Sequence, residues 1–509
     1  MASSLRDQIR QTIESMAERS RDPSAVPDPS DLPLENQPAS ISVSVGGPPV
    51  PVVVPRGGMP AAQARLSAAT RANAAAEERP RAATRPAIAL PMVASFKPNE
   101  PKSLDEAGLD AAFVEGLLIK YLMSHPRATG HATALALALN RGTVRDLLQG
   151  LKDRKLVVFQ GSGDLGDFRY ELTEAGRAVA VDLTKISRYV GPAPVPFEQY
   201  LLSIHEQSIS RESPRMEDLR RAFADLMVQE RLLLQLGPAM TSGKGLFLFG
   251  PPGNGKTSLA ERITRAFGTA VYIPHAILIE GQIVKVFDPM IHETLEDQRS
   301  SVTERADERW IKCRRPTVVV GGELTMDSLE MDFDERTGIC EAPIQVKANC
   351  GTLVIDDFGR QRIDPATLLN RWIVPLESRH DYLKMPDGRK VRFPFDPLLI
   401  FSTNLEPRDL CDEAFLRRIP YKVEVHDPDE DEFFALLIRQ SEELGFEPDE
   451  DVFQYLVEVF FRQTGRAYRY CHARDLLMQV QNQCIFHERP MKITRDAIEL
   501  ATHLYFTLL

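Results

Sequence analysis

The stretch GLFLFGPPGNGKTSLAERITRAFG, residues 245–268, carries the strongest structural signal in the chain. Its four apolar residues Leu246–Phe249 predict a buried strand, and the residues after Lys256 predict a helix. Between them, residues 250–257 fit the pattern GxxxxGK[ST], in the strand–loop–helix context that distinguishes a phosphate-binding loop from a chance match. The sequence therefore predicts an α/β nucleotide-binding fold around this loop.

Each part of the loop has a physical role in binding a triphosphate. Glycines let backbone N–H groups turn inward around phosphate oxygens, and the N-terminus of the next helix adds positive potential. Lys256 is expected to reach the β- and γ-phosphates, and the Thr257 hydroxyl to bind Mg²⁺. ATP and Mg²⁺ are the expected cofactors. The predicted nucleotide contacts in the loop are Gly250, Pro251, Pro252, Gly253, Asn254, Gly255, Lys256, Thr257 and Ser258.

A second anchor for the metal is predicted in TLVIDDFG, residues 352–359, where an apolar strand ends in two carboxylates. A strand beside the P-loop strand would place Asp356 next to the magnesium ion, which is the Walker B role. Asp357 would then polarise the attacking water. The alternative interpretation is that the acidic pair only caps a turn.

With these two motifs the chain resembles the AAA+ ATPases, and three more segments follow in that family's order. LLIFSTN, residues 398–404, is similar to the sensor-1 strand, which implies that Asn404 orients the nucleophilic water. DEAFLRRIPYKVEV resembles the arginine-finger segment and the last core strand, which implies that Arg417 or Arg418 reaches the neighbouring subunit's nucleotide. CHARDLLMQV resembles the sensor-2 helix of the lid, so Arg474 is the expected sensor-2 arginine.

The chain also departs from the family pattern. The family's Walker B motif usually ends in Asp-Glu, whereas here Asp356 is followed by Asp357, as in helicase-loader-type members. The interval from Lys256 to Asp356 is 100 residues, longer than a compact core needs, and we assign the excess to an insertion at 275–349. Part of it resembles the region before Walker B in magnesium-chelatase-like and enhancer-binding members, which implies substrate contact. A surface elaboration without that role is the alternative, and His275 and His292 lack a metal-ligand spacing.

Composition limits the remaining possibilities. The 509 residues include 61 Lys and Arg against 72 Asp and Glu, a formal charge of −11 that disfavours general nucleic-acid binding. Fifteen of the 37 prolines lie between Pro23 and Pro101, so residues 1–103 are expected to be a mostly disordered arm with a short amphipathic helix at its start. The first 21 residues are charged throughout and lack the apolar core of a signal peptide, and the apolar stretch 41–55 is too short to span a bilayer. A cytoplasmic location without membrane insertion is therefore predicted.

Residues 104–185 show three helical segments followed by VVFQ, a Gly/Asp turn and FRYELT. This order resembles a winged helix, the helix-turn-helix variant with a β wing. In DNA-binding members the third helix enters the major groove. Here that helix is basic but diluted by Asp146 and Asp153, and its basic residues are Arg141, Arg145, Lys152, Arg154 and Lys155. Docking to protein is the alternative use of such a domain.

The expected architecture is an α/β P-loop AAA+ core, a parallel sheet flanked by helices, at residues 186–426. A helical lid at 427–509 follows it, and a small α+β winged-helix-like domain and the arm precede it. The resemblance implies an ATPase acting as a homo-oligomeric ring, a hexamer. We expect it to remodel a protein complex, and the sequence does not identify this client. The alternatives are a DNA-directed regulator or loader and a nucleotide-gated scaffold without turnover.

Overall fold

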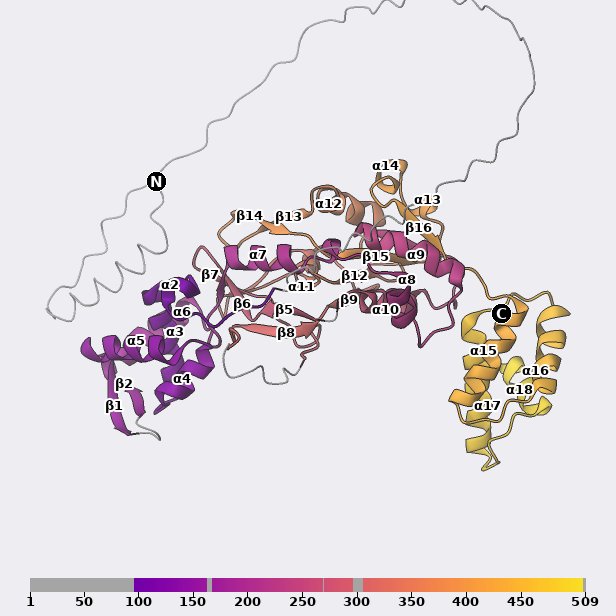
Figure 1. Cartoon of the computed structure of the whole chain (residues 1–509), viewed down its shortest axis with the longest axis horizontal. Coiled ribbons are helices and arrows are strands. Elements are labelled where there is room, and N and C mark those ends of the chain that lie inside the picture. The colour runs from indigo at the N-terminus through magenta and orange to yellow at the C-terminus, as the bar shows by residue number, and fades with distance from the viewer. Residues whose placement is uncertain (1–95, 163–166, 269, 296–304, 507–509) are drawn as a thin grey trace, which may run out of the picture. The chain divides into compact units, whose positions relative to one another are not determined.

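The computed structural model describes residues 96–162, 167–268, 270–295 and 305–506 (Figure 1). The predicted arm, residues 1–103, falls outside the described residues up to position 95, and so does the amphipathic helix expected at its start.

The central sheet has five parallel strands in the order β16-β4-β15-β12-β9. Leu246 of β4 lies opposite both Ile400 of β15 and Tyr421 of β16. All residues of β12 and β15 are buried, because helices cover both faces of a parallel sheet. The strands are β4 (Leu246–Phe249), β9 (Thr317–Val320), β12 (Thr352–Ile355), β15 (Leu398–Thr403) and β16 (Tyr421–Glu424).

Successive side chains of the strands enter two different cores. Leu246 and Leu248 pack on one face with α8 (Met216–Ala222), α9 (Glu230–Ser242) and α10 (Lys256–Ile263). Phe247 points to the other face, where it packs with Trp372 of α12 (Pro365–Ser378). The period of two along each strand thus produces a sheet between two helical layers. The predicted α/β core, a parallel sheet flanked by helices, is confirmed.

A second five-stranded sheet has the order β10-β11-β7-β6-β3. Most of it arises from the segment 275–349 that was predicted as an insertion. One strand of that segment, β9, instead pairs with β12 in the central sheet, so the segment is not wholly peripheral to the core. Its apolar sequence TVVV predicts a strand, but the sequence does not show which of the two sheets that strand joins. The second sheet comprises β3 (Val195–Pro196), β6 (Ala276–Ile279), β7 (Gln282–Lys285), β10 (Asp332–Asp334) and β11 (Ile339–Glu341).

Two antiparallel pairs and several short helices complete the region. The pairs are β5 (Ala270–Pro274) with β8 (Trp310–Arg314), and β13 (His380–Lys384) with β14 (Lys390–Pro394). The helices are α7 (Phe197–Gln207), η2 (Ile209–Arg211), η3 (Thr264–Ala266), η4 (Asp327–Leu329), α11 (Ile344–Lys347), α13 (Pro407–Leu410) and α14 (Glu413–Leu416).

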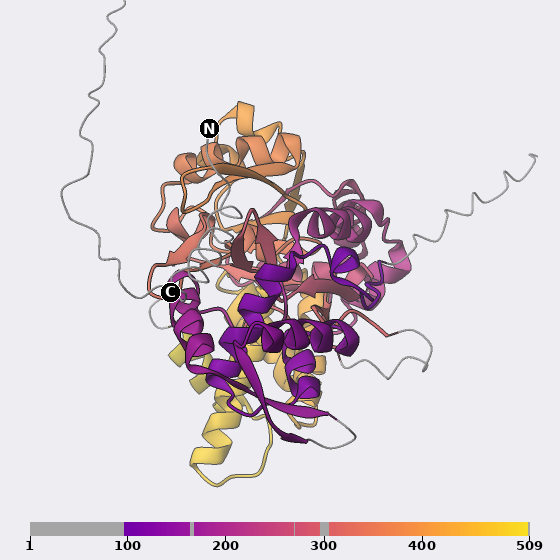
Figure 2. The same ribbon diagram turned by 90° about the vertical axis from the view of Figure 1, so that its left-hand side faces the viewer.

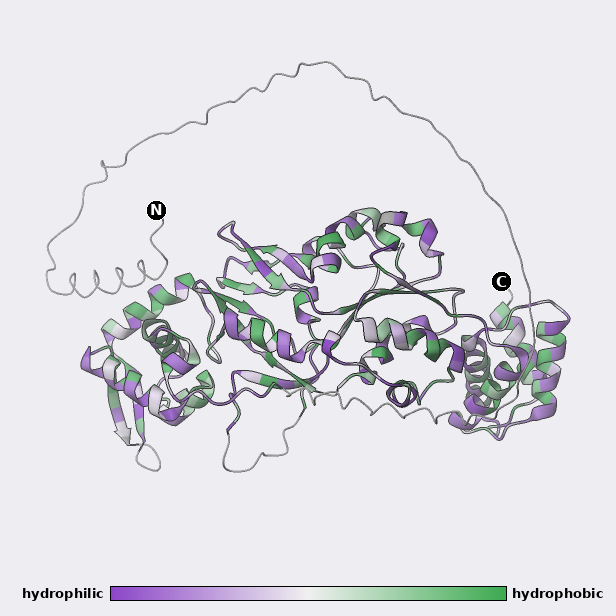
Figure 3. Cartoon of the chain, turned by 45° about the horizontal axis from the view of Figure 1, so that its top comes forward, coloured by the Kyte–Doolittle hydropathy of each residue, from purple (hydrophilic) through white to green (hydrophobic). Residues whose placement is uncertain are grey.

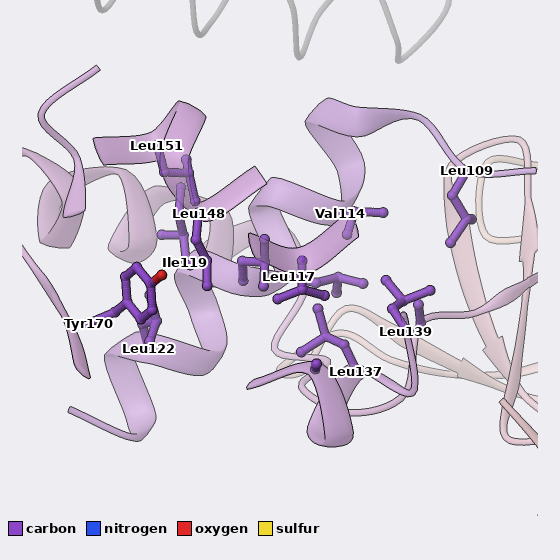
Figure 4. Packing of buried hydrophobic residues seen from close by; sticks show 14 of the residues in the cluster. Leu109, Val114, Leu117, Ile119, Leu122, Leu137, Leu139, Leu148, Leu151 and Tyr170 are labelled. Atoms are coloured by element: carbon purple, nitrogen blue, oxygen red, sulfur yellow. The ribbon is translucent and has the colours of Figure 1, made fainter. Parts of the chain in front are cut away.

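The N-terminal domain follows the helix–helix–helix–hairpin order expected from the sequence. Its core places Val114, Leu117 and Leu148 together, all at most 2% exposed (Figure 4). Figure 2 shows the two hairpin strands extending below the helices. The winged-helix interpretation stays a prediction. The elements are α2 (Leu104–Ala107), α3 (Ala111–Ser124), α4 (Gly130–Leu137), α5 (Arg141–Asp153), β1 (Val157–Ser162), β2 (Phe168–Leu172) and α6 (Glu174–Ile186).

This domain shares its core with the second sheet. Ala276 of β6 and Ile283 of β7 belong to the same buried cluster as the residues of α3 and α5. Arg309 also donates a hydrogen bond from Nη1 to the Ala107 carbonyl at 3.0 Å, and Asp307 pairs with the Arg309 guanidinium. Both charged side chains are almost fully buried, at 2% and 3% exposed.

The C-terminal region is helical, as predicted for the lid. Asp429 begins it as the N-cap of a capping box, with the Glu432 side chain returning a contact to the cap. Its helices carry both hydrophobic and hydrophilic residues along their length (Figure 3), and Phe433, Phe453 and Leu477 are among those that form its core. They are α15 (Glu430–Glu443), α16 (Glu450–Leu456), the π-helix η5 (Val457–Arg462), α17 (Tyr470–Phe486) and α18 (Arg495–Phe506).

The cysteines, possible metal-binding groups and possible membrane-spanning helices complete the description of the fold. All six cysteines lie in the described part of the chain, and all six are free thiols. Among the described residues no group of three or more His, Cys, Asp or Glu could hold a metal ion. No helix within the described ranges is long and apolar enough to cross a membrane.

Candidate nucleotide-binding site

The P-loop, residues 250–257, joins β4 to α10 in a conformation that depends on glycine. Gly250 and Gly253 have φ values of 132° and 84°, a region that side-chain-bearing residues rarely adopt. A Cβ at Gly250 would lie 2.5 Å from the Val425 carbonyl oxygen. One at Gly253 would lie 2.6 Å from the Cys471 Sγ. Both glycines are therefore required by close approach as well as by backbone geometry.

Lys256 points back into the loop and towards the predicted sensor. Its Nζ donates to the carbonyls of Gly250 at 3.0 Å and Pro251 at 2.9 Å, and to the Asn404 Oδ1 at 2.6 Å. Burial of the side chain lowers the pKa of Lys256, and the carboxylates of Asp357 and Asp356 oppose that shift. The ammonium group is thus held in place by oxygen atoms that a phosphate could replace.

The predicted magnesium ligands come together. The Thr257 Oγ1 donates to the Asp356 Oδ2 at 2.8 Å, because α10 starts beside the carboxyl end of β12. Asp356 is itself fixed by the chain around it, since its backbone N–H donates to Val320 of the neighbouring strand β9. One hydroxyl and one carboxylate oxygen from two elements are the donor types that Mg²⁺ uses when it also binds phosphates.

Asp357 and Asn404, the predicted water-activating pair, contact each other. Asp357 has φ of 48°, a left-handed conformation that places its exposed side chain beyond the end of β12. The Asn404 Nδ2 donates to the Asp357 Oδ1 at 3.2 Å. Asn404 therefore bridges Lys256 and Asp357, so the P-loop, Walker B and sensor-1 segments converge at one point.

A cavity of about 610 Å³ adjoins the loop. The P-loop, α10 and the end of β16 form one part of its wall. The segment 225–232, which leads into α9, and the lid helices α15 and α17 form the rest. Ser258 and the exposed side chain of Arg474, the predicted sensor-2 residue, both line it. Gly253, Asn254 and Gly255 also line it. The other predicted loop contacts do not: Gly250, Pro251, Pro252, Lys256 and Thr257.

The predicted arginine-finger residues are placed apart from this constellation. Arg417 ends α14, and its side chain is exposed. Arg418 is half-buried, and its Nε lies 2.7 Å from the Glu377 Oε1 on α12. Neither arginine lines the cavity beside the P-loop.

Three polar residues at this site were not singled out from the sequence. Asp427, in the link between β16 and α15, accepts a 2.7 Å hydrogen bond from the Asn254 Nδ2, and it pairs with Arg469 at the start of α17. The Cys471 backbone N–H donates to the Gly253 carbonyl at 2.9 Å. No sequence motif identifies Asp427 or Arg469. The available signal in the sequence is their position, beside the core–lid junction and the predicted sensor-2 helix.

The residues present fit a magnesium nucleotide. The loop supplies inward-turned backbone at its glycines, an ammonium group and a hydroxyl–carboxylate pair, next to a cavity large enough for a nucleoside. The Asn254 Oδ1 is also buried without a hydrogen-bond partner among the described residues, so a polar acceptor is left for a ligand or water.

Comparisons with known proteins in sequence match only part of the chain. A family model described as "Domain of unknown function (DUF8689)" matches residues 429–504, which are the lid helices. A vesicle-fusing ATPase from Caenorhabditis elegans is 29% identical over 213 residues, or 42% of this chain. The match covers 20% of that relative, so this chain corresponds to about a fifth of its length.

Two solved structures show low similarity to the chain. The Holliday junction branch migration motor RuvB from Thermotoga maritima is 14% identical, with 59% of this chain and 72% of that chain covered and a TM-score of 0.31. NtrX from Brucella abortus in complex with ADP is 14% identical, with 64% and 65% covered and a TM-score of 0.34.

The site and the sequence match point to the same family. A P-loop, an acidic strand end and Asn404 converge at the carboxyl edge of one parallel sheet, and helices of the C-terminal region line part of the adjoining cavity. The curated relative with matching sequence is an ATPase. In its site and in part of its sequence, the chain is therefore similar to the AAA+ ATPases.

Proposed function

We propose that this protein is a magnesium-dependent ATPase that uses ATP hydrolysis to remodel a protein complex. The observation that carries the proposal is the hydrogen bond between Thr257 and Asp356, which unites the two predicted metal ligands. When bound, Mg²⁺ would neutralise phosphate charge. Lys256 would hold the β- and γ-phosphates, and Asp357, oriented by Asn404, would accept a proton from the attacking water.

Turnover in this proposal requires a second copy of the chain. The exposed Arg417 side chain is free to leave the surface of its own subunit, whereas Arg418 is held by Glu377. An arginine supplied in trans is worth about 10³–10⁵ in rate in comparable P-loop systems. We therefore propose that the protein acts as a homo-oligomeric ring, a hexamer, with Arg417 as the finger and Arg474 reading the nucleotide from the lid.

The charge on α5 supports a protein client over duplex DNA. Arg145 lies 3.6 Å from Asp146, and Arg154 lies 2.5 Å from Glu115. A helix that enters the major groove needs unpaired cations for the phosphates, and two of the cations near this helix already face carboxylates.

Nucleotide binding and turnover by the full-length protein test the proposal together. Wild-type protein is expected to bind labelled ATP in the presence of Mg²⁺ and to release phosphate, and Lys256→Ala is expected to abolish binding. A folded wild-type protein that binds no magnesium nucleotide would refute the proposal. Phosphate release that rises with duplex DNA, and loses this rise in an Arg145→Ala/Lys152→Ala variant, would instead favour the DNA-directed regulator.

A further inference from the structure

The turn that follows strand β12 is bridged by the side chain of Gln361. Its Nε2 donates to the Asp356 carbonyl at 2.8 Å, and its Oε1 accepts from the Gly359 N–H, also at 2.8 Å. Gln361 is half-buried, so water has limited access to these two hydrogen bonds. One amide group thus uses its donor and its acceptor to join the residues on either side of Asp357 and Phe358.

The bridged turn contains an unusual backbone conformation. Asp357 has φ of 48°, in the left-handed region that residues with a side chain rarely adopt. The Arg360 N–H donates to the Asp357 carbonyl at 3.0 Å, which closes the turn within the Gln361 bridge. A left-handed residue persists where its surroundings hold it in place, and here the surroundings include Gln361. Asp is also among the residues best tolerated in this region, which favours Asp over the Glu usual at this position.

The other side of the turn is attached to the strand that carries the sensor. The Phe358 N–H donates to the Ser402 carbonyl at 2.7 Å, and the Thr403 Oγ1 donates to the Phe358 carbonyl at 2.8 Å. Thr403 directly precedes Asn404, whose Nδ2 donates to the Asp357 Oδ1. Strand β15 therefore fixes Phe358, and Gln361 fixes the residues before and after the Asp357–Phe358 pair.

We propose that Gln361 is a positioning residue for ATP hydrolysis, which holds Asp357 in the left-handed conformation that directs its carboxylate towards Asn404 and the attacking water. This inference rests on the proposed function, because it takes Asp357 as the group that accepts the proton. Without the bridge, Asp357 can relax to an ordinary backbone conformation, and its carboxylate then leaves Asn404. Gln361 does not line the cavity beside the P-loop, and both of its hydrogen bonds go to the backbone of the turn. It is therefore expected to act on hydrolysis and not on nucleotide affinity.

The test measures single-turnover hydrolysis of bound ATP by the full-length protein. Gln361→Met keeps the length of the side chain and removes both hydrogen bonds. We expect it to slow hydrolysis about 10- to 100-fold, because a misplaced catalytic group loses rate steeply with distance. ATP affinity should change less than about threefold, since the effect is confined to the chemical step.

The decisive comparison repeats this substitution in the Asp357→Asn variant. If Gln361 acts by positioning the Asp357 carboxylate, Gln361→Met should cause no further loss of rate once that carboxylate is gone. A residue with a merely structural role would lower the rate by the same factor in both backgrounds.

Two further variants serve as controls. Gln361→Glu keeps an acceptor for the Gly359 N–H and loses the donor to the Asp356 carbonyl, so it should slow hydrolysis less than Gln361→Met. Gln481→Met removes a comparable hydrogen bond within the lid, from the Gln481 Nε2 to the Leu444 carbonyl at 3.2 Å, and should leave the rate unchanged.

The possible outcomes separate the inference from the proposed function. An unchanged rate in Gln361→Met, or an equal loss in both backgrounds, would overturn the inference alone. A wild-type rate in Asp357→Asn would refute the role of Asp357 in the proposed function, and the inference with it. Circular dichroism and thermal unfolding identify a variant that fails to fold; if Gln361→Met does, Gln361→Glu decides by the same comparison.

Discussion

The Thr257 Oγ1 and the Asp356 Oδ2 lie 2.8 Å apart, although 99 positions separate the two residues in the chain. Substituting Thr257 by Val keeps the shape of the side chain and removes the hydroxyl. Mg²⁺ raises the affinity of the wild type for ATP in this proposal. In the Val variant we expect that increase to be smaller by at least about tenfold, because one metal ligand is gone. Thr257→Ser retains the hydroxyl and serves as the control. Titration with ATP at several Mg²⁺ concentrations measures the effect, and an unchanged Mg²⁺ dependence in the Val variant would argue against a metal at this pair.

Asp357 is expected to act in turnover and not in binding. Asp357→Asn keeps the size of the side chain and its ability to contact Asn404, but it cannot accept a proton at neutral pH. We predict that ATP affinity changes less than about threefold, while the rate of phosphate release falls about 10²–10⁴-fold. Single-turnover assays with bound ATP separate the two effects. Full activity in the Asn variant would assign the base elsewhere.

The two arginines that end α14 should differ in their effects. Arg417→Ala is predicted to leave nucleotide affinity intact and to reduce turnover by about 10³-fold or more, because the finger acts on a neighbouring subunit. Arg418→Ala removes the contact with Glu377 and should act mainly on stability. Mixing Arg417→Ala subunits with Lys256→Ala subunits provides a further check, since a trans arginine predicts partial recovery of activity in mixed assemblies. Wild-type hydrolysis by both single variants would exclude this segment as the finger.

The buried pair between Asp307 and Arg309 is expected to stabilise the N-terminal half of the described structure. Asp307→Asn would leave the Arg309 guanidinium, which is 2% exposed, without its charged partner. Breaking such a pair typically costs about 3–5 kcal/mol, so we predict a clear loss of thermal stability. Arg314→Ala is the matched control: it removes an ion pair with Glu293 that is more than half exposed, which is worth about 0–1 kcal/mol. Equal, small effects of both variants would contradict the prediction.

The lid should lose stability as the pH falls, through His472. This side chain lies among the rings of Phe461, Tyr505 and Phe506, and burial lowers its pKa from 6.5 to about 4. Because the unfolded chain then binds the proton more tightly, stability is complete above pH 6.5 and declines as the pH falls from 6.5 to 4. The contribution is at most about 3 kcal/mol.

Hydrogen exchange of α17 between pH 7 and pH 5 measures this dependence once corrected for the intrinsic exchange rate. A His472→Gln variant should be less stable at pH 7, because a polar amide replaces a ring among aromatic neighbours. It should also show a flatter pH profile. Identical profiles for the variant and the wild type would assign the dependence to other groups.

The sequence predicted the core of the site because the signals there are local. The glycine spacing of residues 250–257, the apolar strand before Asp356 and the apolar strand before Asn404 each reveal a strand end, and parallel strands bring their carboxyl ends to one edge. The contacts from Thr257 to Asp356 and from Asn404 to Lys256 place these residues together as expected. Their catalytic roles stay predictions.

The contacts between distant surfaces could not be obtained in this way. Asp427 and Arg469 are 42 positions apart, and their pairing depends on how the lid docks on the loop, which no short motif encodes. Strand β9 was placed in the insertion because a four-residue apolar run does not reveal which sheet it joins. The packing of the N-terminal helices on β6 and β7 is likewise a property of two complementary surfaces.

That shared packing has a practical consequence for dissecting the molecule. A shortened chain starting at α7 would leave Ala276 and Ile283 without the leucines that cover them, and water would meet an apolar patch. The N-terminal domain ahead of α7 therefore belongs to the same hydrophobic core as strands β6 and β7. A truncated form of the protein should therefore retain both the N-terminal domain and the second sheet.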